Sequence, residues 1–164
     1  MMIRSPRLIY LAMFLVCSGL IGFALYLQHA LRLEPCPMCI LQRYAFIVVG
    51  VTALSAAIHD PGLFGRRLYS ALLIVMAATG GGVAIRHVYL EHNPPKIFDC
   101  GADVGFMLES FPLTQVLPMI FRGTGDCTKV PWRFLSLSIA EWSLICFALL
   151  IVAAGVAAGM KRRA

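Results

Sequence analysis

The chain has 164 residues, of which 60% are hydrophobic and only 13% are charged, and its mean hydropathy is +0.82. A soluble domain typically has about 45–50% apolar and about 25% charged residues, so this composition excludes an ordinary soluble domain and indicates a membrane protein. It also excludes a disordered chain, a coiled coil and a nucleic-acid-binding module, although the net charge is +6.

Four segments are long and apolar enough to cross a bilayer. A helix needs about 20 apolar residues to span about 30 Å of hydrocarbon, and a spanning segment is helical unless it belongs to a closed barrel. We therefore predict an all-α fold, a four-helix transmembrane bundle that forms a single membrane domain over residues 1–164. The predicted spans are residues 8–27, 40–58, 68–85 and 142–160.

The distribution of charge predicts the orientation of these spans. In a four-span bundle the N-terminus, the turn after the second span and the C-terminus lie on one side, and together they carry seven Lys and Arg residues against one acid, Asp60. The other side carries seven residues of each sign. Because Lys and Arg in short flanks stay in the cytoplasm, we predict cytoplasmic termini and two outer loops, at about residues 28–39 and 88–141.

The second outer loop is long enough to suggest a function of its own, because loops of more than about 15 residues are usually functional or disordered. It contains the apolar stretch 106–121, FMLESFPLTQVLPMIF, which Pro112 and Pro118 interrupt. This stretch is too short and too broken to span the membrane. We predict a short interfacial segment that lies on the bilayer, and a packed loop that covers the bundle is the alternative.

Glycines in two of the spans predict close helix packing. The third span contains Gly80-Gly81-Gly82, and the fourth contains Gly155 and Gly159 at a spacing of four residues. Small residues let transmembrane helices approach closely. We expect this packing within one chain rather than between two copies.

The six cysteines fall into two groups. Cys17 and Cys146 lie inside the first and fourth spans, where we expect chemically inert, small apolar residues. The others lie in the outer loops, where an oxidising compartment permits disulfides. Four thiols make two pairs with three possible connectivities. These four are Cys36, Cys39, Cys100 and Cys127.

The motif Cys36-Pro37-Met38-Cys39 stands at the predicted N-terminus of the second span. The partial positive charge of a helix N-terminus favours a thiolate over a thiol. Arg43 follows Cys39 by four residues and so lies on the same helix face. We expect its guanidinium to face the Cys39 thiolate or a ligand's oxygen, and the alternative is that it extends to the lipid headgroups.

Other uses of two spaced cysteines fit less well. Covalent haem attachment needs a histidine directly after the second cysteine, and Ile40 stands there. A four-cysteine zinc site needs paired spacing, whereas 60 residues separate Cys39 from Cys100 and 26 separate Cys100 from Cys127. We therefore expect no metal site. Two static disulfides that brace the outer loops are the stronger alternative to redox exchange.

Taken together, these motifs resemble the disulfide bond formation protein B family (DsbB), bacterial membrane proteins that reoxidise a periplasmic thiol oxidase. The resemblance covers nearly the whole chain and implies an inner-membrane location, a DsbA-like protein partner and a quinone cofactor, either ubiquinone or menaquinone. The motifs that carry it are Pro35-Cys36-Pro37-Met38-Cys39, Gln42-Arg43, Glu91-His92, Cys100, Gly125-Asp126-Cys127 and Trp132-Arg133-Phe134-Leu135.

The resemblance also implies a route for the electrons. The reduced partner attacks Cys100 and frees Cys127, which then attacks Cys36. Cys39 is released as a thiolate that faces a bound quinone and passes two electrons to it, helped by Arg43.

The resemblance further places His92 near the quinone, although Glu91-His92 is equally compatible with a pair at the membrane boundary. A specialised member of the family with one dedicated partner would carry the same residues. A non-catalytic membrane protein with structural loop disulfides is the alternative from a different class.

Overall fold

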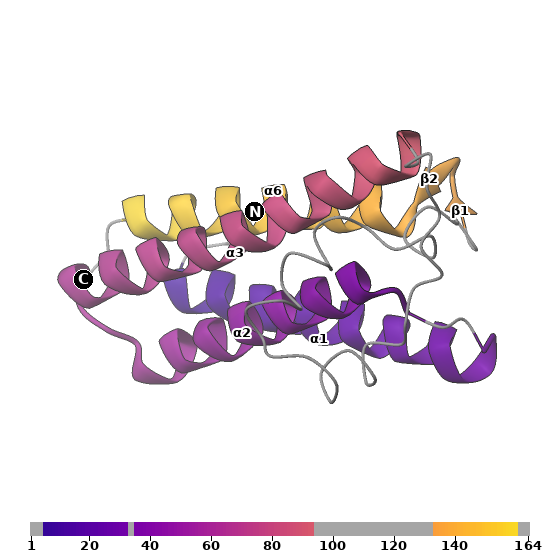
Figure 1. Cartoon of the computed structure of the whole chain (residues 1–164). Helices are drawn as coiled ribbons and strands as arrows, with labels where there is room; N and C mark the ends of the chain where they lie inside the picture. The colour runs from indigo at the N-terminus through magenta and orange to yellow at the C-terminus, as the bar shows by residue number, and fades with distance from the viewer. Residues whose placement is uncertain (1–4, 33–34, 94–132, 161–164) are drawn as a thin grey trace, which may run out of the picture.

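A computed structural model of the chain describes residues 5–32, 35–93 and 133–160. These residues form four long helices and one small hairpin (Figure 1). All four helices are long and apolar enough to cross a membrane, which confirms the predicted four-helix membrane fold. In chain order the elements are α1 (Pro6–Ala30), α2 (Pro37–His59), α3 (Leu63–His92), β1 (Arg133–Phe134), β2 (Leu137–Ser138) and α6 (Ile139–Gly159).

Most helix ends extend beyond the predicted spans, because hydropathy marks only the part of a helix that matches the hydrocarbon. The first turn of α2 includes Cys39, which the sequence placed at the end of the short outer loop. Helix α3 continues to His92, so residues 88–92 of the predicted long loop are helical. The apolar stretch 106–121 lies outside the described residues.

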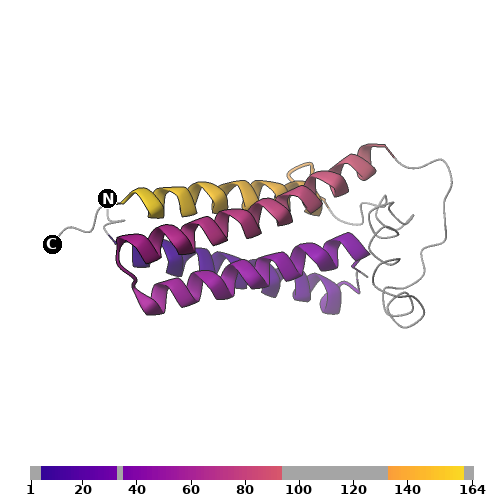
Figure 2. The same cartoon turned by 60° about the vertical axis from the view of Figure 1, so that its left-hand side comes forward.

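The helices run alternately in opposite directions. Helix α1 packs along α2, α2 along α3, and α3 along α6. The start of α1, the turn between α2 and α3 and the end of α6 therefore lie together at one end of the bundle (Figure 2). The first turn of α2, the end of α3 and the hairpin lie toward the opposite end, where the sequence placed its outer loops.

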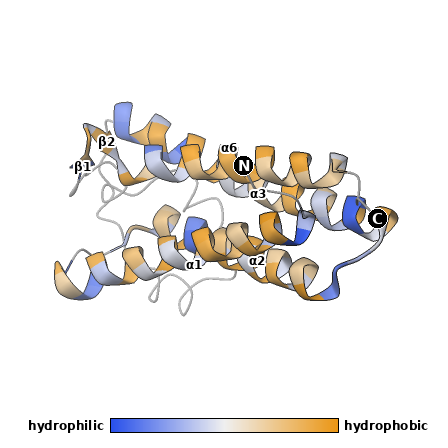
Figure 3. Cartoon of the chain, turned by 180° about the vertical axis from the view of Figure 1, so that it is seen from behind, coloured by the Kyte–Doolittle hydropathy of each residue, from blue (hydrophilic) through white to orange (hydrophobic). Residues whose placement is uncertain are grey.

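The bundle is apolar both inside and outside. In its centre the rings of Phe46 and Phe147 stack with their centroids 4.1 Å apart and their planes at 6°. Large apolar side chains also cover the outer faces of the helices (Figure 3), among them Leu15, Val75 and Leu149, each at least 60% exposed. Soluble proteins rarely expose such continuous apolar surface, whereas lipid covers it at no cost.

Among the described glycines, Gly80 lies closest to the neighbouring helices. A Cβ built there would lie 2.5 Å from two ring atoms of Phe147 and 2.9 Å from the Cβ of Ala45. The predicted close packing of the third span is thus confirmed. A Cβ at Gly155 or Gly159 would meet nothing within 4 Å, so the glycines of the fourth span make no such contact in the described bundle.

The hairpin before α6 is absent from the all-α prediction. Phe134 pairs with Leu137, and the two residues between them, Leu135 and Ser136, have φ of 52° and 68°. Positive φ at both central positions is the geometry of a type I′ turn, which usually requires Asn or Gly. Strands of two residues show no hydrophobic alternation, and this turn lacks its usual residues, so the sequence gives no signal for it.

At the opposite end of the bundle, Arg66 lies in a helix and is buried, whereas the charge count treated it as part of an exposed turn. The sequence put it in a cytoplasmic turn, but it lies in the first turns of α3 and is only 3% exposed. Its backbone oxygen accepts a hydrogen bond from the Tyr10 hydroxyl at 3.2 Å, and the same hydroxyl lies 2.8 Å from Ser70 Oγ. This contact ties α1 to α3.

Replacing Gly80 with alanine should destabilise the bundle, because the added methyl group overlaps Phe147 and Ala45. Overpacking of a well-filled core costs about 1–3 kcal/mol. The matched control is Gly82→Ala on the same helix, where a Cβ meets nothing within 4 Å. Thermal unfolding in detergent should show a lower midpoint for Gly80→Ala than for Gly82→Ala, and equal midpoints would contradict the packing described here.

Candidate functional site

The cysteine pair forms the beginning of α2. Cys36 is the N-cap residue, with φ of −66° and ψ of 161°, and Pro37 follows in the first turn, where its missing N–H removes no helical hydrogen bond. The backbone N–H of Cys39 donates to Cys36 Sγ at 3.4 Å. The predicted helix N-terminus is therefore confirmed, and its N–H groups favour a thiolate at Cys36.

The two sulfurs lie next to each other. Cys36 Sγ and Cys39 Sγ are 3.2 Å apart, so small side-chain rotations bring them to bonding distance. Cys36 is only 7% exposed, whereas Cys39 is half-buried. Met38 and Leu90, both almost fully buried, pack around Cys36. The pair is thus sheltered on the Cys36 side and more open on the Cys39 side.

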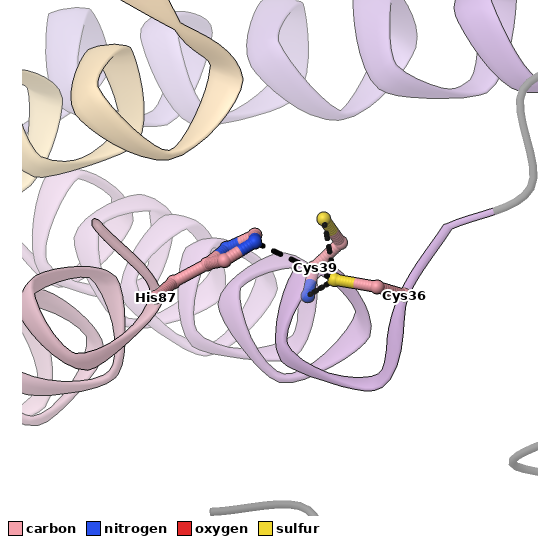
Figure 4. A group of neighbouring side chains, drawn as sticks. All are labelled: Cys36, Cys39 and His87. Carbon is pink, nitrogen blue, oxygen red and sulfur yellow. Dashed lines mark hydrogen bonds between the residues drawn. The ribbon is translucent and has the colours of Figure 1, made fainter. Parts of the chain in front are cut away.

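A histidine from α3 lies beside this pair (Figure 4). His87 Nε2 is 3.6 Å from Cys36 Sγ, and the imidazole is 4% exposed. On the other side of the ring, Gln42 Nε2 is 3.1 Å from His87 Nδ1, and Gln42 is 3% exposed. With the amide nitrogen of Gln42 as the donor, Nδ1 accepts and the ring proton sits on Nε2. In that tautomer Nε2–H can donate to the sulfur of Cys36.

A carboxylate completes the polar cluster. Glu91 follows His87 by one helical turn, its side chain is 7% exposed, and its Oε1 lies 3.7 Å from His87 Nε2. His87 Nε2 therefore lies near both a sulfur and a carboxylate in largely apolar surroundings. Polar interactions are stronger in such an environment than in water, so this cluster fixes the orientation of the imidazole.

Sequence reasoning selected His92 and missed His87. The structure places His92 on the exposed end of α3, with Nδ1 2.9 Å from the backbone oxygen of Val88 and Nε2 4.0 Å from Glu141 Oε1. His87 carried one usable signal, since an ionisable residue near the end of an apolar span is a functional candidate by default. Which helix face points to Cys36 depends on how α3 packs on α2.

Arg43 makes its described contacts with α1. Its guanidinium donates to Gln28 Oε1 at 2.5 Å and to the backbone oxygen of Ala24 at 3.2 Å. The sequence predicts that this guanidinium faces the Cys39 thiolate or a ligand's oxygen, whereas its described partners are these two oxygens of α1. The guanidinium is half-buried and fixes α2 against α1.

Of the other four cysteines, the structure describes two. Cys100 and Cys127 lie outside the described residues. Cys17 is 2% exposed and packs beside Gly50, where a Cβ would lie 3.1 Å from the Cys17 Cβ. Gly50 is about 20 Å along α2 from Cys36, so Cys17 lies far from the pair. Cys146 packs against the same central core as Cys17.

The sequence also matches known proteins. A family model described as "Disulfide bond formation protein DsbB" matches residues 6–157. "Disulfide bond formation protein B" of Aromatoleum aromaticum is 54% identical over 158 residues, which cover 96% of this chain and 95% of that protein. The protein of the same name in an Azoarcus species is 54% identical over 144 residues, 88% and 87% of the two chains. "Disulfide bond formation protein B 1" of Pseudomonas aeruginosa is 43% identical over 148 residues, 90% and 91% of the two chains.

The contact between Gln42 and His87 should show as a coupling energy in a double-mutant cycle. Gln42→Leu or His87→Leu alone leaves a buried polar partner without its hydrogen bond, which costs about 1–3 kcal/mol. The double variant removes both partners and should lose about 1 kcal/mol less than the sum of the two. The free energy of unfolding, measured by titration with a denaturing detergent, tests this.

The control cycle pairs Gln42→Leu with His92→Leu, whose side chain is 63% exposed. Those two effects should add. If the effects of Gln42→Leu and His87→Leu also add, the contact contributes nothing to stability.

Proposed function

The chain belongs to the disulfide bond formation protein B family, and from this premise we propose that it reoxidises a periplasmic thiol oxidase of the DsbA type and passes the two electrons to a membrane quinone. It is a disulfide bond formation protein whose described helices are long enough to cross a membrane. The observation that carries the proposal is a pair of adjacent thiols at the N-cap of a membrane-crossing helix, with a buried imidazole beside the first of them.

The proposed reaction begins in the long outer loop. A thiolate of the reduced partner attacks Cys100 in a Cys100–Cys127 disulfide, so that a mixed disulfide forms and Cys127 leaves as a thiolate. Cys127 then attacks the sulfur of Cys36 in the Cys36–Cys39 disulfide. A Cys36–Cys127 bond forms, and Cys39 leaves as a thiolate. These pairings follow from the family resemblance.

The residues at the start of α2 give this exchange its direction. The backbone N–H of Cys39 donates to Cys36 Sγ and His87 Nε2 lies 3.6 Å from it, and these contacts hold the sulfur in one orientation for attack. Cys39 lies in the same first turn and is less buried than Cys36. A thiolate released at Cys39 therefore stays on the first turn of α2 and is more exposed than Cys36.

Energetics explain why an electron acceptor is needed. Thiol oxidases of the DsbA type have potentials near about −120 mV, whereas structural disulfides lie below about −300 mV. A structural pair would therefore oxidise such a partner uphill by about 180 mV, or about 8 kcal/mol. Turnover needs an unusually oxidising pair or the removal of electrons by a stronger acceptor.

The residues near Cys39 fit a quinone as that acceptor. A guanidinium has five N–H groups, and the contacts of Arg43 with Gln28 and Ala24 use two of its nitrogens. The remaining donors of Arg43, one helical turn beyond Cys39, would hold a quinone oxygen near Cys39. When bound, a quinone supplies an acceptor for two electrons. A role for His92 at this site stays a prediction.

Anaerobic quinone reduction by the purified protein tests the function, with a reduced periplasmic oxidase as the electron donor. Serine substitutions at Cys36, Cys39, Cys100 or Cys127 should each abolish turnover, because each removes one sulfur from the chain of exchanges. The double variant with alanine at Cys17 and Cys146 should retain nearly full activity. A wild-type protein that reduces no quinone would leave structural disulfides as the explanation for the cysteines.

Arg43→Met should raise the apparent KM for quinone by about tenfold or more and lower kcat, because a hydrogen bond from a charged donor contributes about 1.5–3 kcal/mol. Arg43→Lys should recover part of this loss, since the charge returns without the planar fork. Steady-state titrations with quinone measure both effects on correctly inserted protein.

The control is Gln28→Leu, which removes one α1 partner of Arg43 and keeps the guanidinium. It should change the KM for quinone much less than Arg43→Met does. If Gln28→Leu and Arg43→Met have equal effects, Arg43 acts only by holding α1 against α2.

A further inference from the structure

The three side chains at the start of α2 also have the composition of a metal site. Cys36 Sγ, Cys39 Sγ and a ring nitrogen of His87 all lie within 4.8 Å of one another. Thiolates and imidazole are the ligands that Zn²⁺ prefers in proteins. We propose that the reduced Cys36–Cys39 pair and His87 form a binding site for a thiophilic divalent cation such as Zn²⁺, which holds the pair in the reduced state.

The distances between the ligand atoms match a tetrahedral site. Zinc binds sulfur at about 2.3 Å and nitrogen at about 2.0–2.1 Å, so two sulfurs on one ion are about 3.8 Å apart, and a sulfur and a nitrogen about 3.6 Å apart. The structure has 3.2 Å between the two sulfurs and 3.6 Å between Cys36 Sγ and His87 Nε2. Cys39 Sγ and a ring nitrogen of His87 lie within 4.8 Å of each other, so side-chain rotations that move these atoms by up to about an ångström admit the ion.

The surroundings of His87 suit a metal ligand. A ligating histidine usually uses its other ring nitrogen to donate to an oxygen, which fixes the orientation of the ring. Gln42 occupies that position at Nδ1, 3.1 Å away, and is buried. If this amide turns by 180°, its Oε1 accepts a hydrogen bond from Nδ1–H of His87. The ring proton is then on Nδ1, so Nε2 has a free lone pair that can bind the ion.

The charges and the fourth coordination position also fit. Two thiolates neutralise a divalent cation, so a buried complex avoids the penalty of an uncompensated charge. Three protein ligands leave a fourth position for water, which keeps the complex neutral. Glu91 Oε1 lies 3.7 Å from His87 Nε2, close enough to accept a hydrogen bond from that water.

Such a site would respond to the redox state of the pair. Binding replaces the two thiol protons and releases them, with no transfer of electrons. A Cys36–Cys39 disulfide has no thiolate to offer, so the oxidised protein has no site. The ion would therefore compete with reoxidation of the pair, whatever the protein partner and the electron acceptor are.

Cobalt binding tests the site directly, because Co²⁺ bound to thiolate gives a charge-transfer absorption band and Zn²⁺ displaces it. The protein for this experiment is the full chain in detergent with Cys17 and Cys146 changed to alanine and Cys100 and Cys127 to serine. After anaerobic reduction it should bind one Co²⁺ per chain. The oxidised protein should bind none, and equal binding in both states would overturn the proposal.

Variants of the histidine distinguish this site from binding by the thiols alone. His87→Ala and His87→Gln should each weaken Co²⁺ binding about tenfold or more, whereas His59→Ala, at the other end of α2, should leave it unchanged. His87→Gln keeps a polar side chain of similar size, so it decides the question if the alanine variant does not fold. Unchanged affinity in a folded His87 variant would contradict the proposal.

The native chain offers a second measurement. In the reduced wild-type protein, Zn²⁺ should slow the alkylation of Cys36 and Cys39, followed by mass spectrometry, more strongly than that of Cys100 and Cys127. Equal protection of all four cysteines would mean non-specific binding to thiols and would overturn the proposal.

Discussion

The first turn of α2 has to satisfy its backbone N–H groups at the end of a membrane-crossing helix, and it uses the sulfur of Cys36 to do so. The first N–H groups of any helix lack partners within the helix, and at the edge of hydrocarbon an unpaired N–H is costly. Because Cys36 accepts from the backbone of Cys39, one sulfur both caps the helix and belongs to the reactive pair. The position of the cysteines is therefore tied to the stability of the helix itself.

The polar cluster between α2 and α3 extends this constraint into the bundle. His87, Gln42 and Cys36 are all less than 10% exposed, so their contacts are protected from exchange with water. The same packing leaves Cys39 half-buried. The arrangement gives two chemically equal thiols different surroundings, one buried beside an imidazole and one more exposed. That difference is what a thiol pair needs if it is to receive electrons on one side and release them on the other.

The sequence was sufficient for features that depend on local composition. The four spans followed from hydropathy, and so did the position of the Cys36–Cys39 motif at the N-terminus of the second span, although the helix begins three residues before the predicted span. The neighbours of Arg43 could not be predicted, because Gln28 and Ala24 become close only when α1 packs on α2. His87 was missed for the same reason, since its face depends on the rotation of α3. The hairpin around Leu135 and Ser136 lacks the usual turn residues, so no local rule identifies it.

The central claim is that the Cys36–Cys39 pair is a redox centre that a membrane quinone keeps oxidised. The most direct measurement is thiol trapping of this pair in growing cells that can be depleted of quinone, with a reagent that adds mass to each reduced cysteine. On depletion the pair should change from oxidised to reduced, and it should become oxidised again when quinone is restored. A pair that stays oxidised throughout depletion is a static brace, and that result would contradict the account.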